Sequence, residues 1–318
     1  MKRFLFLLAG VGVLFVAANF FTVFLFHHFL HYEPQYLTYL KPFSTLRGSY
    51  DLLITGDSHA LAAWRNLKSP SVANLAFGAD NELDIQRKIA FLNRHGIRSK
   101  IHLFETDAHV VSSYREKANN NDLSVNLESA ASPLRLRLLV YMPYVFDPRI
   151  KPDIEVLFKR VLKKVFNQPG KLVNGEKKDE DAQFLGRANE QFLSGRVSEV
   201  FTRQLEENVA VIKGSGAELV FILYPLQQNY LDLIGDSPLY HNAHEFVKRL
   251  AGKEGARILD YTKAVCRDSN FINQDHLRHG RLFFQAAVLE ALKGSGDQEP
   301  QCLDENPPLN LEFLVAPP

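Results

Sequence analysis

The chain carries, from Asp51 to Ala60, the sequence Asp-Leu-Leu-Ile-Thr-Gly-Asp-Ser-His-Ala. A short apolar run stops at Gly56, Asp57 and Ser58, and helix-forming residues follow it. This order predicts a β-strand, a turn and a helix, with the hydroxyl of Ser58 at the carboxyl edge of a sheet and backbone N–H groups beside it. Nucleophilic acyl transfer needs that arrangement. The alternative is an ordinary helix N-cap, because Asp and Ser are favoured before any helix.

A second motif lies near the other end of the chain. Residues 271–280 read Phe-Ile-Asn-Gln-Asp-His-Leu-Arg-His-Gly and place His276 just before an apolar helix predicted over 282–292. An early serine in a Gly-Asp-Ser block and a late histidine resemble the SGNH (GDSL-type) hydrolases. The likeness is greatest to the membrane-anchored branch that O-acylates cell-envelope polymers, such as the alginate O-acetylation proteins and the D-alanyl transfer protein of teichoic acid synthesis.

The expected fold is a three-layer α/β/α, flavodoxin-like SGNH fold with a parallel sheet. Apolar segments that read as strands alternate with amphipathic helices such as the one at 82–92, which is typical of a doubly wound sheet. After the strand that precedes Ser58, strands are predicted at 71–79, 100–109, 217–225 and 256–261. The resemblance covers roughly residues 50–114 and 200–292.

The resemblance implies site residues at the carboxyl edge of this sheet. Ser58 would be the nucleophile and His276 the general base and acid. The N–H groups of Ser58 and Gly78 would bind the oxyanion. In the third block of the family pattern, Asp107 and His109 occupy the region where the family has an asparagine. We expect His109 to be the better oxyanion donor, because a carboxylate such as Asp107 would repel an oxyanion unless it were protonated.

The residue expected to orient the imidazole departs from the family pattern. Asn273 stands three residues before His276, where the family has an aspartate. An amide can hold the tautomer but does not stabilise an imidazolium as a carboxylate does. Asp275 is the nearest carboxylate in sequence, but its direct adjacency predicts poor geometry for reaching the ring. We therefore assign the orienting role to Asn273 or, failing it, to Asp275.

The N-terminus predicts a membrane anchor. Residues 4–26 form an uncharged span of 23 residues, long enough to cross a bilayer of about 30 Å. Lys2 and Arg3 precede it, so residues 1–3 are expected in the cytoplasm. The chain beyond a linker at 27–49 is then periplasmic or extracellular, as in a single-pass protein of the inner membrane. The alternative is a cleaved signal peptide, although the apolar run exceeds the usual ~7–15 residues.

The rest of the chain predicts one domain with an insertion. The SGNH-like domain is expected over 50–295, with a helical insertion at about 115–204 and a proline-rich tail at 296–318. An insertion of this length is usually a cap over an active site or a docking surface. It contains an apolar stretch at 134–144 and a basic helix at 154–166, which fits either a solvated face or a polymer-binding or membrane-surface role.

Cysteine use and composition restrict the chemistry. The only two cysteines, Cys266 and Cys302, could form a disulfide outside the cytoplasm, and two reduced buried thiols fit equally well. No metal-ligand spacing and no phosphate-binding glycine loop is found in the sequence, so neither a metal nor a cofactor is expected. A net charge of +1 gives no argument for nucleic-acid binding.

The resemblance therefore implies a membrane-anchored serine O-acyltransferase or esterase that moves an acyl group, expected to be O-acetyl, onto or off an envelope glycan. Its expected partners are an envelope polysaccharide or acyl donor and a multi-pass membrane O-acyltransferase. The alternative is a weakly active or inactive module of the same fold that binds glycan or scaffolds that partner. The departure at Asn273 favours this alternative, and the presence of both Ser58 and His276 argues against it.

Overall fold

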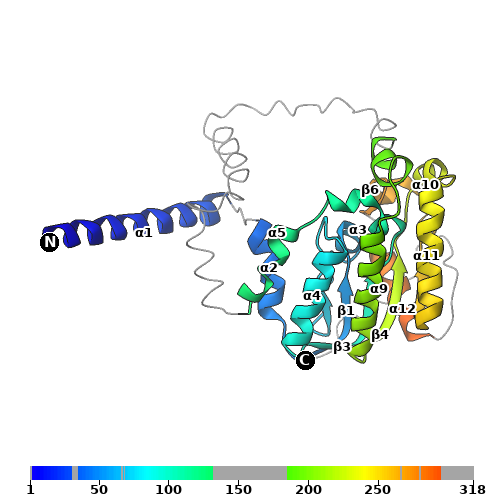
Figure 1. Ribbon diagram of the computed structural model, residues 1–318, viewed down its shortest axis with the longest axis horizontal. Coiled ribbons are helices and arrows are strands. Elements are labelled where there is room, and N and C mark those ends of the chain that lie inside the picture. The colour runs from blue at the N-terminus through cyan, green and yellow to red at the C-terminus, as the bar shows by residue number, and fades with distance from the viewer. Residues whose placement is uncertain are drawn as a thin grey trace. The chain divides into compact units, whose positions relative to one another are not determined.

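The computed structural model divides the chain into two compact units (Figure 1). One unit comprises Met1–Thr45 and Asn126–Lys177, and the other comprises Leu46–Val125 and Lys178–Pro318. The structure describes residues 2–30, 35–65, 67, 69–131, 185–265, 267–278 and 281–294. All residues of the candidate site belong to the second unit.

The first unit is helical where it is described. It contains α1 (Lys2–Leu30), α2 (Gln35–Thr45) and the 3₁₀ turn η3 (Leu127–Ser129), which packs against α2. The predicted membrane span over residues 4–26 lies within α1. Among the described residues, however, no helix combines the length and the hydropathy required for a membrane crossing.

The second unit is built on a five-stranded parallel sheet with the strand order β2-β1-β3-β4-β5. The strands are β1 (Ser49–Thr55), β2 (Val72–Asn74), β3 (Arg98–Glu105), β4 (Glu218–Leu223) and β5 (Arg257–Asp260). This is the flavodoxin-type order, which confirms the predicted parallel α/β fold. The order reverses between β1 and β3, and ligands of such sheets bind outside the carboxyl ends of the strands at that point.

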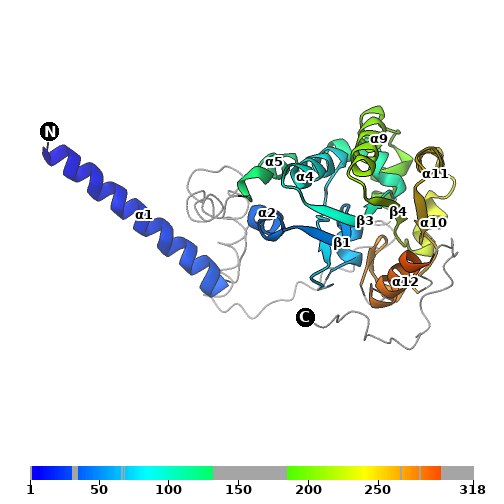
Figure 2. The same cartoon turned by 90° about the horizontal axis from the view of Figure 1, so that it is seen from below.

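Helices cover both faces of the sheet, so its central strands read as nearly continuous apolar runs. In Figure 2, α4 and α9 lie above the strands and α12 below them. On β4, Leu219 and Phe221 belong to one apolar core, whereas Val220 and Ile222 belong to the other. The first core contains side chains of α4 (Glu82–Arg94), α9 (Glu199–Gly214) and α11 (Pro238–Glu254), and the second contains side chains of α3 (Ser58–Ala63) and α12 (Arg281–Lys293).

Short elements at the carboxyl edge complete the second unit. The histidine motif forms an antiparallel pair, β6 (Phe271–Asn273) and β7 (His276–Leu277), and β7 packs against α3. The remaining short elements are η1 (Ala108–Val111), η2 (Ser113–Glu116), α5 (Asn121–Ser124), the π-helical η6 (Asn189–Leu193), α10 (Gln228–Ile234) and η7 (Asp268–Asn270).

Several sequence predictions fall outside the described residues. They are the apolar stretch at 134–144, the basic helix at 154–166, both cysteines of the predicted disulfide (Cys266 and Cys302) and the proline-rich tail at 296–318. These features therefore stay predictions.

Candidate functional site

The turn after β1 has the predicted strand-turn-helix form. β1 ends at Thr55, and α3 begins at Ser58 with Asp57 as its N-cap. A Cβ on Gly56 would lie 2.6 Å from the Cβ of Glu105 and 2.8 Å from that of Ala60. Only glycine fits at this position, because β3 and the start of α3 approach the backbone so closely.

Ser58 and Gly78 lie side by side. A Cβ built on Gly78 would be 3.8 Å from the Cβ of Ser58. The two turns are joined by a hydrogen bond from the N–H of Phe77 to the carbonyl of Gly56 at 3.2 Å. The next residue, Ala79, has a φ of 67°, a left-handed conformation that costs a non-glycine residue about 1–2 kcal/mol. The loop after β2 is therefore held against the turn that presents Ser58.

His276 is brought to the same edge because β7 packs against α3. Its Nδ1 is 2.8 Å from Oδ1 of Asn273 and 2.7 Å from Oδ1 of Asp275. Both neighbours are acceptors, so Nδ1 carries the proton and Nε2 remains the basic nitrogen of the neutral ring. The side chain of His276 is 16% exposed, which leaves it accessible.

Asp275 lies nearer the imidazole than its adjacency suggested, at 2.7 Å, but its Oδ1 makes no hydrogen bond there, which agrees with the predicted poor geometry. Side chains of consecutive residues point apart when both lie in a strand. Asp275 lies instead in the turn between β6 and β7, where the pairing is irregular, and its carboxylate turns back to the ring of His276. Asn273 does contact Nδ1, so both alternatives for the orienting residue meet at one nitrogen.

His59, the residue after Ser58, bridges two carboxylates. Its Nδ1 is 2.5 Å from Oδ2 of Asp107, and its Nε2 is 3.3 Å from Oδ2 of Asp275. Its ring meets that of His276 edge-on, with centroids 5.2 Å apart. Burial alone would lower the pKa of His59, but its two carboxylate partners raise it well above its ordinary value. His59 therefore carries a positive charge inside the protein.

Asp107 and His109, the predicted third-block residues, both have internal partners. Oδ1 of Asp107 accepts the N–H of Tyr224 at 2.7 Å, and its Oδ2 faces His59. Nε2 of His109 is 2.9 Å from Oδ2 of Asp57. Burial lowers the pKa of His109 below its ordinary value, so its neutral ring donates to Asp57 through Nε2–H.

A buried ion pair supports this edge from below. Oδ2 of Asp57 is 3.1 Å from Nη1 of Arg115, and both side chains are almost fully buried. Burial alone would raise the pKa of Asp57, but His109 and Arg115 hold it well below its usual range. Glu105 lies next to this pair, accepts the N–H of Asp57 at 2.6 Å and has its pKa raised well above the ordinary value by burial and by the nearby aspartates. The Glu105 carboxyl is therefore neutral.

Two groups of side chains have donor atoms close enough together to bind a metal ion. They are Asp57, His59, Glu105 and His109, and also His59, Asp275 and His276. A guanidinium already contacts a carboxylate in each group, since Arg115 binds Asp57 and Arg187 lies 3.3 Å from Asp275. These guanidiniums supply positive charge where a metal would, and they would repel one. We therefore interpret both groups as ion-pair networks.

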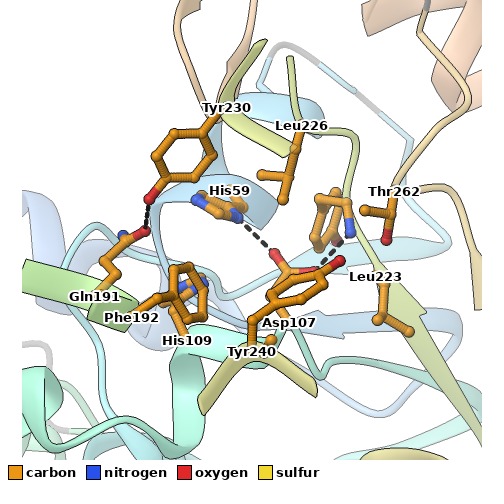
Figure 3. A pocket seen from close by; sticks show the side chains of 12 residues that line it. His59, Asp107, His109, Gln191, Phe192, Leu223, Leu226, Tyr230, Tyr240 and Thr262 are labelled. Carbon is orange, nitrogen blue, oxygen red and sulfur yellow. Dashed lines mark hydrogen bonds and ion pairs between the residues drawn. The ribbon is translucent and has the colours of Figure 1, made fainter. Parts of the chain in front are cut away.

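A small cavity lies behind His59 (Figure 3). Its volume of about 10 Å³ is close to the least that holds one water molecule. Its wall includes Phe192, Tyr240 and Tyr230, whose hydroxyl is 2.6 Å from the side-chain amide of Gln191. The cavity is too small for an acyl substrate, so it serves the packing around His59.

Four functional candidates were missed at the sequence level: His59, Glu105, Arg115 and Arg187. One signal was present for Glu105, because an acidic residue at the end of an otherwise apolar strand is unusual. His59 was adjacent to the quoted serine, but nothing in the sequence showed that two distant aspartates would face it.

Comparisons with known proteins found only distant similarities, all among solved structures. No protein-family model matches it, and no curated protein matches it. Similar solved structures include an acylhydrolase from Bacteroides fragilis NCTC 9343 (TM-score 0.39, 9% identity, 82% of this chain and 100% of that chain). For a GDSL-like lipase from Bacteroides thetaiotaomicron VPI-5482 the TM-score is 0.39 and the identity 7%, and the match covers 81% of this chain and 96% of that chain. For the periplasmic domain of a lipopolysaccharide acetyltransferase from Salmonella ser. Paratyphi A the TM-score is 0.38 and the identity 10%, and the match covers 78% of this chain and 86% of that chain. These scores are low, and the interpretation of the site depends on the geometry of this chain.

Proposed function

We propose that this chain is a serine-dependent acyl-transfer enzyme of the SGNH type, with Ser58 as nucleophile and His276 as general base and acid. The observation that carries the proposal is the contact between β7 and α3, which brings the serine motif and the histidine motif together at the carboxyl edge of the sheet. Because Nδ1 of His276 is bound to Asn273 and faces the carboxylate of Asp275, Nε2 is left to take the proton of the serine hydroxyl.

The reaction would have two halves. Oγ of Ser58 attacks the carbonyl carbon of an acyl ester while its proton passes to Nε2 of His276, and the N–H groups of Ser58 and Gly78 bind the oxyanion. The imidazolium then protonates the leaving alcohol, and an acyl-serine remains. In the second half His276 deprotonates an acceptor hydroxyl, which attacks the acyl-serine. A glycan hydroxyl as acceptor gives transfer, and water gives hydrolysis.

The departure of Asn273 from the family pattern does not argue against activity in this geometry. Asp275 supplies the carboxylate that stabilises an imidazolium at His276, while Asn273 accepts from the same Nδ1 and holds the tautomer. The two residues together perform what a single aspartate does in a Ser-His-Asp triad.

Our proposals for the substrate and the location of the protein are based on the sequence alone. The uncharged span at 4–26 and the resemblance support a single-pass anchor in the inner membrane, with the domain outside the cytoplasm. The acyl group is proposed to be O-acetyl on an envelope polysaccharide, delivered through a multi-pass membrane O-acyltransferase. Protease added to spheroplasts should then digest the chain beyond about Tyr32. A soluble mature protein beginning near Asn19 would contradict the anchor.

The proposed chemistry can be tested with a serine-directed fluorophosphonate and with hydrolysis of p-nitrophenyl acetate. We expect a covalent adduct on Ser58, found by peptide mass spectrometry, and loss of both adduct and hydrolysis in Ser58→Ala. Ser215→Ala is the matched control, because Ser215 caps α9 just before β4 begins, at the opposite edge of the sheet. Hydrolysis that survives in Ser58→Ala would contradict the nucleophile.

A non-catalytic glycan-binding or scaffolding module remains the second candidate. The observation that favours it is that Asp107 and His109 are bound to His59 and Asp57, so neither side chain is free to serve an oxyanion. Under this alternative, neither the wild type nor any variant would react with the fluorophosphonate, while the wild type would still bind an envelope polysaccharide.

A further inference from the structure

The carboxylate of Asp275 is shared between the proposed base, the buried ring of His59 and the partly exposed guanidinium of Arg187. Its side chain is completely buried. Oδ1 is 2.7 Å from Nδ1 of His276, whereas Oδ2 is 3.3 Å from both Nε2 of His59 and Nε of Arg187. A carboxylate held at one oxygen has little freedom to rotate, so the groups at Oδ2 determine where Oδ1 points.

The contacts of His59 favour protonation of both of its ring nitrogens. Nδ1 faces Asp107, and Nε2 faces Asp275. Either neutral tautomer would leave one nitrogen lone pair directed at a carboxylate oxygen inside the protein. The second oxygen of Asp107 accepts the N–H of Tyr224, which anchors this end of the chain of contacts to the end of β4.

These contacts interlock two dipeptides. Ser58-His59 supplies the proposed nucleophile and the buried cation, and Asp275-His276 supplies the carboxylate and the proposed base. A displacement of His59 would therefore move the carboxylate that orients His276 without touching the nucleophile's own hydroxyl.

We propose that His59 is a positioning residue for His276: its ring attracts Oδ2 of Asp275 as an ion pair at 3.3 Å, so that Oδ1 of the same carboxylate stays turned to Nδ1 of His276. The inference rests on the proposed function, in which His276 is the base. His59 contacts no reacting atom in this scheme. Arg187 binds the same Oδ2 from the other side, but its side chain is 26% exposed, and it lacks the link to Asp107 that fixes His59.

The side chains of Asn and Gln allow the two ends of His59 to be tested separately. The amide nitrogen of a Gln at this position comes near the place of Nε2, and that of an Asn near the place of Nδ1. His59→Gln therefore keeps a donor for Asp275, and His59→Asn keeps one for Asp107. Both variants lose the ring: His59→Gln also loses the hydrogen bond to Asp107, and His59→Asn the ion pair with Asp275, so their stabilities are measured alongside.

The first measurement is the hydrolysis of p-nitrophenyl acetate by the full-length chain. We expect His59→Asn to lose about 10²-fold in kcat, the effect of a misplacement of about 1 Å at a catalytic group, while KM stays within about twofold. His59→Gln should keep a clearly higher kcat than His59→Asn. Equal kcat values for the two variants, or a loss confined to KM, would overturn the proposal.

The second measurement is ¹⁵N NMR of the histidine side chains, which needs no variant. In the wild type we expect both nitrogens of His59 to be protonated and His276 to populate only the Nδ1–H tautomer. The His59→Asn chain should show a mixture of tautomers at His276. A single protonated nitrogen on wild-type His59 would overturn the proposal, even if neither variant folds.

Two outcomes separate this inference from the alternatives. Zinc that copurifies in a one-to-one ratio with the wild type and is absent from His59→Asn would overturn the proposal, because His59, Asp275 and His276 would then be ligands. If Ser58→Ala hydrolyses the ester as fast as the wild type, the proposed function fails. The NMR result would still report whether His59 orients Asp275.

Discussion

Two helices begin at the carboxyl edge of the sheet directly after a strand, and their N-caps differ. Asn81 caps α4 with a capping box, in which its Oδ1 accepts the N–H groups of Leu83 and Asp84 and its own N–H donates to the Asp84 carboxylate. Asp57 caps α3 through one bond, to the N–H of His59. Its second oxygen binds His109, 52 residues further along the chain.

The difference shows that two N-cap residues with the same local role can have different partners elsewhere in the chain. The cap bonds of Asn81 lie within three residues of it, but its Nδ2 also donates to the carbonyl of Arg115, and the Asp84 carboxylate accepts the N–H of Asn120. Asp57 also joins the turn that presents Ser58 to the segment after β3, through His109 and Arg115. The α4 turn is therefore joined to the segment after β3 by hydrogen bonds to backbone groups, whereas the turn at Asp57 is joined to it by a buried network of charges.

The largest effect is expected where this network meets the proposed base. Asp275→Asn should lower kcat for p-nitrophenyl acetate by up to about 10⁴-fold, the loss known for a triad aspartate changed to asparagine. Asn273→Ala should lose much less, because Asp275 still contacts Nδ1 of His276. The comparison of the two variants by steady-state kinetics decides which residue orients the ring. A larger loss in Asn273→Ala would return that role to Asn273.

The next largest effect is expected on stability at the Asp57 turn. Arg115→Met removes the guanidinium from a buried carboxylate, which typically costs 3–5 kcal/mol, so we expect a loss of about that size in the free energy of unfolding by urea. Asp57→Asn introduced together with Arg115→Met should recover part of it, because no uncompensated charge is then buried. A loss under about 1 kcal/mol in Arg115→Met would show that the Asp57–Arg115 ion pair contributes little to the free energy of unfolding.

A pH effect is expected at the α4 turn. Burial raises the pKa of Glu82 from an ordinary 4.5 to about 8, although a hydrogen bond from Asn208 partly opposes the shift. The native chain therefore holds this proton more tightly than the unfolded chain. Its contribution to stability is complete below about pH 4.5 and is lost as the pH rises to about 8 and beyond.

Glu82→Gln should remove this part of the pH dependence and raise the stability at pH 8.5 relative to the wild type. Urea unfolding at pH 5 and pH 8.5 measures it, with the exposed Glu245→Gln as the control. A Glu82→Gln chain that loses as much stability as the wild type between these pH values would contradict the assignment.

The smallest effect is expected for the local cap. Asn81→Ala should reduce the free energy of unfolding by about 1 kcal/mol, the usual contribution of an N-cap, and leave kcat unchanged. Asn242→Ala, at an exposed position of α11, is the control. A fall in kcat beyond that in stability would show that the α4 turn also positions Ser58 or Gly78, which would remove the contrast between the two turns.

The sequence alone determined the local parts of this protein. The strand-turn-helix around Ser58 and the alternation of strands and helices that predicts a parallel sheet follow from short-range patterns of apolar residues, glycines and caps, whereas the approach of the His276 motif was expected from the family resemblance. Such patterns act over a few residues, so a single chain read in order is enough to find them. The side-chain contact of Asn273 with His276 was within the same range.

Tertiary structure decided which partner the second nitrogen or oxygen of each polar side chain at this edge contacts. The bridge of His59 between Asp107 and Asp275, and the pairing of Asp57 with Arg115, join segments that meet only because the strand order reverses between β1 and β3. Even for the adjacent Asp275, the distance of its carboxylate from the His276 ring depends on the turn between β6 and β7. Charge networks of this kind are set by three-dimensional distance and burial, which no local pattern of residues contains.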